Sequence, residues 1–238
     1  MLNKTSSHTN MSSIPGKSIR LLVTETTTNT IVGFIRLGSP VINSKPRNEY
    51  LGRPLQTTDL KEMGRFNNSA IMGFVIVPTQ PFGYNYLGGK LLAAICCSHF
   101  VRDILNKKYD TNICLFETTS LYGSSKSSSQ YDGMKPYLRY KGLTDSNFLP
   151  LLHGEAFKKM NTWFTERNGE PLVDPEASSR KLKTQTKMVS IIKESLKKYD
   201  ANLYDKFSKF VNKTRDLTEK KRFYMSDYGY ENVSQYLK

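Results

Sequence analysis

The chain has 238 residues and a formal net charge of +14, from 35 basic and 21 acidic residues. This length suits one main domain with a smaller attachment and needs no disulfide or metal to stabilise a core. Three cysteines form neither a disulfide framework nor a zinc-binding spacing, so a disulfide-rich secreted domain is excluded and no metal is expected.

Residues 1–16 are rich in Ser, Thr and Asn and are predicted to form a flexible tail instead of a signal peptide. The longest apolar run, residues 91–97, is too short to span a bilayer. We therefore expect a cytoplasmic protein, in the host cytoplasm if it is phage-encoded and nuclear if the host is eukaryotic, with no membrane partner. The excess of positive charge favours nucleic acid, DNA first, as the partner.

Two runs rich in β-branched residues, 18–24 and 30–37, flank a polar turn and predict a β-hairpin. A loop with three prolines, at positions 40, 46 and 54, precedes a short helix predicted from residue 58 to 64, with Thr57 or Thr58 as its N-cap. Residues 70–77 are continuously apolar and predict a strand buried on both faces. A helix over 87–109 and a strand over 113–116 complete a parallel crossover.

This order of elements predicts an α/β domain over residues 17–165, with a mixed central sheet flanked by helices. Residues 166–178 contain Gly169, Pro171 and Pro175 and are predicted to form a linker. The remaining residues, 179–238, are predicted to form a basic and mainly helical C-terminal region. From 180 to 238 there are 15 basic and 7 acidic residues, a difference of +8.

The loop after the buried strand is rich in glycine and leads into a helix, a layout in which backbone N–H groups can converge on a phosphate. A P-loop is excluded because Gly89 precedes Lys90 and Leu91 replaces the Ser or Thr that would bind magnesium. A Rossmann fingerprint is excluded by the glycine spacing and by the preceding hairpin.

The same layout resembles the GNAT acyltransferase superfamily, in which a Q/R-x-x-G-x-[GA] loop grips the pyrophosphate of an acyl-coenzyme A. This chain matches at Gln80 and Gly83 and departs at Asn85, while Pro81 lacks a donor N–H. The resemblance implies a GNAT-like sheet and acetyl-CoA or another acyl-CoA as cofactor. The alternative is a turn that binds no ligand. The implied cofactor-binding residues are Gln80, Gly83, Tyr84, Asn85, Gly88, Gly89 and Lys90.

Several separate blocks lie between residues 33 and 143: residues 38–41, 47–52, 65–69, 88–93, 117–125 and 129–131. Together they resemble a narrower family, the domain carried by the Druantia anti-phage defence protein A and its phage and transposon relatives. This resemblance implies defence or mobile-element biology around DNA, without a settled reaction.

Acyl transfer to an amine needs a base and a proton donor for the departing thiolate. Glu117 ends a buried strand, is expected to face the helix after the loop, and is the candidate base. The alternative interpretation is that the Glu117 side chain caps the following Thr/Ser turn. Tyr131 and Tyr137 are candidate proton donors, because the GNAT resemblance implies a tyrosine after this strand.

Candidate contacts to nucleic acid come from two regions. Arg47 and Asn48 lie in a predicted polar loop, where Arg47 is expected to grip a phosphate or a base edge, or else to form a surface salt bridge. The basic C-terminal region offers phosphate contacts, a solvated helix face, or a surface for a protein partner. Its candidate residues are Lys197, Lys198, Lys220, Lys221 and Arg222.

Two hypotheses follow from the sequence. The first is a GNAT-like acyltransferase or DNA-modification enzyme associated with phage or mobile-element DNA. The second is a non-catalytic nucleic-acid-binding module that keeps the fold without the cofactor.

Overall fold

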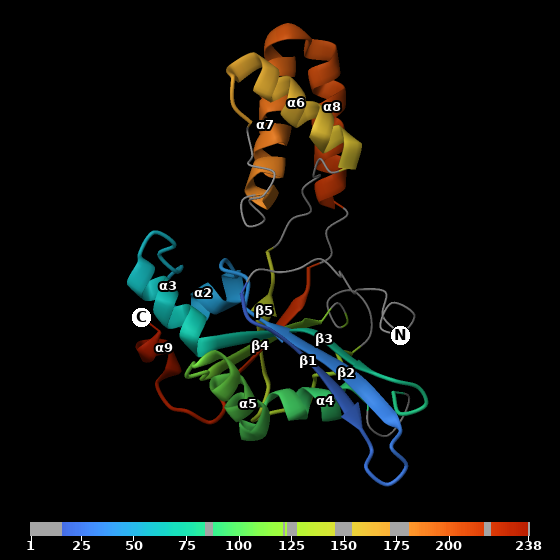
Figure 1. The fold of residues 1–238 in the computed structure, drawn as a ribbon, viewed down its shortest axis with the longest axis vertical. Coiled ribbons are helices and arrows are strands. Elements are labelled where there is room, and N and C mark those ends of the chain that lie inside the picture. The colour runs from blue at the N-terminus through green and yellow to red at the C-terminus, as the bar shows by residue number, and fades with distance from the viewer. Residues whose placement is uncertain are drawn as a thin grey trace. The chain divides into compact units, whose positions relative to one another are not determined.

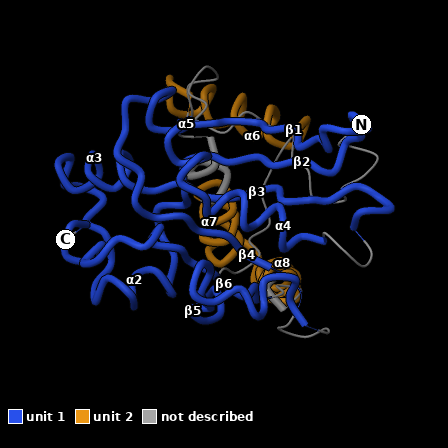
Figure 2. The backbone as a smooth tube through the Cα atoms, turned by 90° about the horizontal axis from the view of Figure 1, so that it is seen from below, with its two compact units in different colours: residues 1–145, 219–238 blue, residues 146–218 orange. Residues whose placement is uncertain are grey.

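A computed structural model describes residues 16–83, 88–120, 122, 128–145, 154–171, 181–216 and 220–237 of the chain. The chain divides into two compact units. Unit 1 comprises residues 1–145 and 219–238, and unit 2 comprises residues 146–218 (Figure 2). Each unit has its own secondary structure.

Unit 1 contains all the described strands and most of the described helices (Figure 1). Its strands are β1 (Ser18–Thr24), β2 (Ile31–Gly38), β3 (Ala70–Pro78), β4 (Leu115–Ser120), β5 (Arg139–Leu143) and β6 (Arg222–Ser226). Its helices are α2 (Lys45–Leu51), α3 (Leu60–Ser69), α4 (Gly88–Cys96), α5 (His99–Tyr109) and α9 (Val233–Tyr236).

The strands form a mixed sheet in the order β1-β2-β3-β4-β6-β5. The pairs β1–β2 and β2–β3 are antiparallel, and β3 and β4 run parallel. β6 pairs antiparallel with both β4 and β5, so the last strand in the sequence lies between two earlier ones. The single parallel pair follows from the crossover through α4 and α5, which returns the chain to the same end of the sheet.

Helices cover both faces of this sheet. Figure 1 shows α4 and α5 below it, with α2 and α3 on its other side. On the α4/α5 face, one core packs Ile71, Phe116 and Tyr224 against Leu92 and Leu105. The period-2 alternation of strand residues gives the opposite face its own core. That second core contains Leu51, Phe66, Leu115, Phe223, Met225 and Val233.

The helix termini agree with local capping rules. Asp59 is the N-cap of α3, where its side chain accepts hydrogen bonds from the N–H groups of Lys61 and Glu62. Ser98 caps α5 by accepting from the N–H of Val101, and α5 ends at Asp110 in the left-handed conformation. The break at Ser98 separates α4 from α5, where the sequence predicted one continuous helix.

Unit 2 is helical and contains α6 (Gly154–Asn168), α7 (Lys181–Tyr199) and α8 (Ala201–Asp216). Its core is small: Met188 and Val211 are the buried apolar side chains among its described residues. Across the described part of the chain, no helix has both the length and the apolar character that a membrane crossing requires.

The structure confirms the mixed α/β fold, the hairpin, the buried third strand and the parallel fourth strand. It corrects the segment 47–52, predicted as a loop, which lies largely in α2 with Pro46 in its first turn. It also places the third helix at Leu60–Ser69 with Asp59 as the cap, not Thr57 or Thr58.

The structure divides the chain at different points from those that the sequence suggested. α6 belongs to unit 2 although the sequence placed residues 154–165 in the α/β domain. Residues 222–226 form β6 of the main sheet, not part of a helical tail. The apolar residues Phe223 and Met225 of β6 gain a buried position between β4 and β5, which a separate tail would not offer.

Candidate functional site

The parallel strands β3 and β4 separate at their carboxyl ends. They pair over four positions, from Ala70 opposite Leu115 to Gly73 opposite Thr118. Beyond this point β3 continues to Pro78 paired with β2 alone, and β4 continues to Ser120 paired with β6 alone. Ligands of open α/β sheets bind at the carboxyl ends of such strands. We call this place the carboxyl-edge site.

Side chains pack closely around Gly73, where the strands separate. A Cβ atom at Gly73 would lie 2.9 Å from Ile76 Cδ1 and 3.1 Å from Phe116 Cζ, so a side chain there would require both neighbours to shift. The Thr118 hydroxyl donates to the carbonyl oxygen of Gly73 over 3.1 Å. This bond is the last link between the two strands before they diverge.

Hydroxyl groups line the α4 side of the carboxyl-edge site. Tyr131 is 3% exposed, and its ring meets that of Tyr224 edge-on at a centroid distance of 5.3 Å. Burial raises the pKa of Tyr131, and hydrogen bonds with the side chains of Thr118 and Gln130 partly counter that rise. Tyr131 is therefore a neutral O–H group at physiological pH and can donate a proton or a hydrogen bond.

The hydroxyl groups continue into a charged network. The Tyr224 hydroxyl donates to Asp132 Oδ1 at 2.9 Å, and the same oxygen lies 3.1 Å from Arg222 Nη2. The Arg222 guanidinium also stacks over the Tyr140 ring, 4.2 Å from its centroid. Arg222 is thus already engaged with protein groups, unlike a freely solvated phosphate-binding cation.

The N-terminus of α4 reaches the same network through Gly89. A Cβ at Gly89 would come within 1.8 Å of Gln130 Oε1, so glycine alone allows Gln130 to lie there. Lys90, on the first turn of α4, is exposed. The first four N–H groups of a helix lack an intrahelical acceptor and favour anions. Gly89, Lys90 and Gln130 therefore form a short polar surface beside the strand ends.

Two of the predicted cofactor-binding amides are already engaged. The Gly83 N–H donates to Thr79 O at 2.8 Å, and the Gly88 N–H donates to Phe82 O at 3.0 Å. Gln80 folds back toward Gly83, because a Cβ there would lie 3.2 Å from Gln80 Nε2. Two other predicted residues, Tyr84 and Asn85, lie outside the described residues.

On the opposite face of the sheet, Glu117 forms a fully buried ion pair with Arg47 of α2. Arg47 Nη1 lies 2.9 Å from Glu117 Oε2 and 3.2 Å from Oε1, and both side chains are 0% exposed. Arg47 Nη2 donates to the carbonyl oxygens of Val41 and Ile42 at 2.7 and 2.5 Å. The guanidinium lies 4.5 Å from the centroid of the Phe66 ring.

This placement differs from the sequence predictions for both residues. Glu117 shares its face with Leu115 and points toward α2 and α3, not toward α4. Its carboxylate binds Arg47, not the following Thr/Ser turn. Arg47 was expected to contact nucleic acid or to form a surface salt bridge, and neither expectation agrees with its complete burial.

Burial raises the pKa of Glu117 from 4.5 to about 7, and the charge and hydrogen bonds of Arg47 only partly counter this rise. A pKa near neutrality suits a general base. However, a base must reach the proton that it removes, and no part of this carboxylate is exposed. The ion pair therefore links β4 to α2 in the structure as it stands.

The other candidates lie apart from the carboxyl-edge site. Tyr137 is 67% exposed and lines a 380 Å³ pocket with Cys97 and His99, at the far end of α4 from Lys90. The Asn48 side chain donates to Asn43 Oδ1. Four predicted nucleic-acid contacts are exposed lysines: Lys197, Lys198, Lys220 and Lys221.

Sequence reasoning missed Thr118, Gln130, Asp132 and Tyr224 as site residues. Thr118 could have been found from the sequence, because it follows Glu117 in a strand and its side chain must therefore face the opposite side of the sheet. Tyr224 alternates with Phe223 and Met225 in a short run that was interpreted as tail. Among the described residues, no group of three or more His, Cys, Asp or Glu side chains is arranged to hold a metal ion.

The sheet order and the covered faces define unit 1 as a mixed α/β domain with a polar edge site. The family described as Druantia protein DruA matches residues 4–126, more than half of the chain. The chain belongs to this family, which associates it with anti-phage defence. Neither the curated proteins nor the solved structures contain a match.

Proposed function

We propose that unit 1 is a GNAT-like acyltransferase domain that binds an acyl-coenzyme A at the carboxyl-edge site and acts on DNA or a DNA-associated substrate. The separation of β3 and β4 after Gly73 and Thr118 carries this proposal. The order of elements supports it, because a hairpin, a buried strand, a loop, a helix and a parallel strand follow one another as in the superfamily.

The diverging strands suit the extended arm of an acyl-coenzyme A. That arm contains amide groups, which can pair with strand backbone in the same way as an added peptide strand. Residues of β3 beyond Gly73 have β2 as their neighbour on one side, and β4 has moved away on the other. An extended ligand inserted here gains backbone partners on β3 and an apolar neighbour in Phe116.

The pyrophosphate is assigned to the first turn of α4. Because the Gly83 and Gly88 N–H groups already donate to backbone oxygens, the proposal relies on the following N–H groups and on Lys90. The sequence had suggested that the loop over residues 80–85 binds the pyrophosphate. The proposal places it instead at the N-terminus of α4. Lys90 contributes a positive charge that is free to follow the ligand.

Tyr131 is the proposed proton donor. In acyl transfer an acceptor amine attacks the thioester carbonyl, the C–S bond breaks, and the departing thiolate takes up a proton while the amine loses one. The neutral Tyr131 hydroxyl lies beside Thr118 at the strand ends and is 3% exposed, so the proposal requires that the bound ligand reach it by separating β3 from β4 further. Glu117 is assigned to stabilising the domain, since its carboxylate is enclosed with Arg47.

Binding of the cofactor is the first test. Acetyl-CoA and coenzyme A should each raise the melting temperature of the full chain, because a ligand that binds only the folded state stabilises it. Lys90→Ala should weaken this shift, while Lys107→Ala, an exposed lysine in the last turn of α5, serves as the matched control. The absence of a shift with any coenzyme A thioester would contradict the proposal.

Chemistry is tested separately. Nucleosides from DNA incubated with the protein and acetyl-CoA are analysed by mass spectrometry for an added acyl mass. Tyr131→Phe should lower the yield by about 10²-fold or more, as expected for loss of a general acid. Binding of acetyl-CoA should survive this change.

A second candidate function is a non-catalytic nucleic-acid-binding module with this fold. The engaged N–H groups of Gly83 and Gly88 favour it, because they close the loop on itself. It predicts DNA binding that weakens steeply with salt, with no response to coenzyme A. Binding that does not depend on salt would contradict this candidate.

A further inference from the structure

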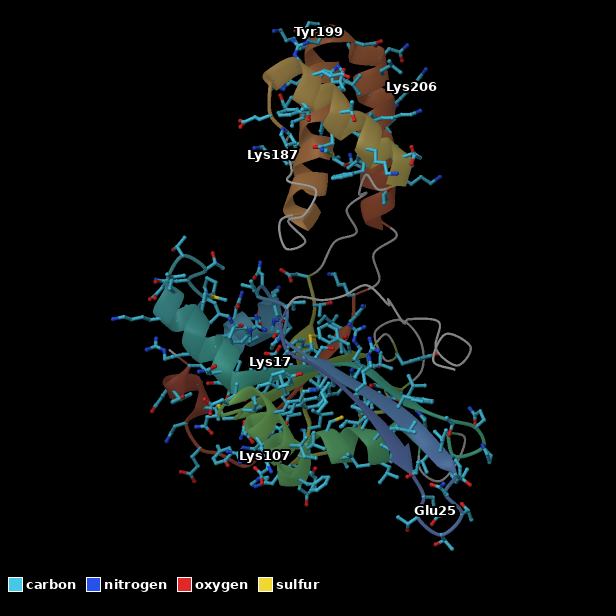
Figure 3. The ribbon with its side chains drawn as sticks, in the orientation of Figure 1. Lys17, Glu25, Lys107, Lys187, Tyr199 and Lys206 are labelled. Carbon is cyan, nitrogen blue, oxygen red and sulfur yellow. The ribbon has the colours of Figure 1, made fainter. Side chains whose placement is uncertain are left out.

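Unit 2 contains an open groove between α6 and α7 with a volume of about 630 Å³. Its lining includes the apolar residues Met160, Ile192 and Leu196 and two aromatic residues, which we call the rim rings. Trp163 of α6 is 45% exposed and Tyr199 of α7 is 76% exposed. We call it the α6–α7 groove. Figure 3 shows the Tyr199 side chain at the end of unit 2 where α7 terminates.

A cationic side chain lies over each of the two rim rings. The Arg167 guanidinium lies 5.8 Å from the Trp163 ring centroid, and Lys198 Nζ lies 5.1 Å from that of Tyr199. Both cations also line the groove, together with the acidic residue Glu194. Exposed cation–π contacts are weak, so these cations can turn toward an anion without a large loss.

The helix that forms one wall is strongly basic. α7 contains six lysines and one acidic residue, a difference of +5 over 19 residues. Of these lysines, Lys198 lines the groove, whereas Lys193 Nζ lies 5.9 Å from the centroid of the Tyr204 ring of α8. The charge of this wall favours an anionic occupant over an apolar or basic one.

The rings further restrict the kind of anion. Exposed aromatic faces beside a basic track are the arrangement that binds single strands, because unpaired bases can stack on rings while phosphates follow the cations. The bases of a duplex already stack on one another and present only their edges. An acidic peptide would match the charge but not the aromatic faces.

We infer that the α6–α7 groove binds single-stranded nucleic acid, with bases stacked on Trp163 and Tyr199 and the phosphates beside Arg167 and Lys198. This site lies wholly within unit 2 and does not depend on the acyl-CoA site of unit 1. It deepens the proposed association with DNA by naming the strand state and the contacting residues.

Trp163 is the only tryptophan in the chain, so its fluorescence reports on the groove alone. The full chain is titrated with oligodeoxythymidylate of about 16 nucleotides, within the range of site sizes known for single-strand binders. We expect saturable quenching of Trp163 that weakens as salt rises. Equal quenching by a duplex of the same length, or by poly-glutamate, would overturn the inference.

Substitutions distinguish binding in the α6–α7 groove from non-specific attraction to a basic protein. Trp163→Ala and Tyr199→Ala should each weaken binding of a labelled oligonucleotide by about five-fold or more. Phe210→Ala is the matched control, since Phe210 is a 60% exposed aromatic residue on α8 outside the groove. Circular dichroism confirms that each variant folds. Equal losses in all three variants would contradict stacking in the groove.

Charge reversal provides an independent comparison. Lys198→Glu should weaken binding and lower the salt dependence more than Lys206→Glu, an exposed lysine on α8 (Figure 3). Light scattering then tests whether Trp163 instead holds two copies together. A dimer that becomes monomeric in Trp163→Ala would assign the groove to self-association and overturn the inference.

Discussion

Glu117 and Thr118 are neighbours in β4, yet they belong to two different environments. Glu117 points toward α2, where its charge is sealed against Arg47 and both side chains are 0% exposed. Thr118 points toward α4 and meets neutral hydroxyl groups at the edge where the parallel strands separate. One strand therefore supports a buried ion pair on one face and a neutral hydroxyl contact on the other.

The contrast shows that a perturbed pKa does not identify a site by itself. The pKa of Glu117, raised to about 7, is the value expected of a general base. However, desolvation raises this pKa, and the carboxylate is enclosed by protein. Tyr131 and Thr118 are neutral hydroxyl groups that are also buried, and the nearest charges on this face are those of the Asp132–Arg222 pair beyond Tyr224. The following predictions test this division between the two faces, from the largest expected effect to the smallest.

The largest effect is expected from breaking the ion pair. Arg47→Met leaves the Glu117 carboxyl without its partner and should lower the free energy of unfolding by about 3–5 kcal/mol. The double variant Arg47→Met, Glu117→Leu should recover most of this loss, because no buried charge remains. Chemical denaturation measures the free energy of unfolding of the single and the double variant. Equal instability of the single and double variants would show that the pair is not the cause.

The pH dependence of stability gives a second test. The pKa of Glu117 is raised to about 7 in the folded state, so the folded chain holds a proton that the unfolded chain has released between pH 4.5 and 7. This contribution to stability is complete below pH 4.5 and is lost as the pH rises through 7. A shift of about 2.5 units corresponds to about 3 kcal/mol.

The measurement compares denaturation curves of the wild type and Glu117→Gln from pH 4.5 to 8. The difference isolates Glu117 from the other carboxylates. Relative to the wild type, the Gln variant should become more stable as the pH rises. A constant difference across this range would mean that Glu117 does not titrate there.

The opposite face should respond more weakly. Thr118→Val removes the hydroxyl that donates to Gly73 O and interacts with Tyr131, and should cost about 1–2 kcal/mol without changing the pH dependence. Denaturation at pH 5 and pH 8 checks both statements. A change in the pH slope in this variant would indicate that the two faces are coupled.

The smallest effects come from two helical glycines. A Cβ atom added at Gly64 of α3 would meet open space, so Gly64→Ala should stabilise the chain by about 0.5–1 kcal/mol. Gly89→Ala should lose this gain, because the new methyl group displaces Gln130. Melting temperatures compare the two. Stabilisation by both substitutions would show that Gln130 moves away without cost.

Much of the fold could be predicted from the sequence because its strands are continuous apolar runs. The hairpin and residues 70–77 needed only local patterns. β6 was missed because its five residues, Arg222–Ser226, follow two lysines and resemble the basic tail. Their place between β4 and β5 depends on pairing with residues about a hundred positions earlier, which no local pattern contains.

The candidate site was predicted less well. Lys90 lies in the first turn of α4, and Tyr131 lies in a turn after β4 and contacts Thr118; their roles stay predictions. The partnership of Arg47 with Glu117 spans 70 residues and has no local indication. An acidic residue within a buried strand indicates that a cation must be near, but the identity of that cation depends on how α2 packs on the sheet.

The position of β6 has a consequence for how the chain is divided in experiments. Unit 2 is inserted between two strands that pair with each other, and its flanking residues are joined, since Thr144 N–H donates to Lys221 O at 2.8 Å. Cutting the chain at residue 179 would remove an interior strand and collapse unit 1. Replacing residues 146–218 with a tight turn would instead leave a β-hairpin. The helical unit thus occupies the connection of a β-hairpin, so the sheet holds together the two ends of the chain segment that forms it.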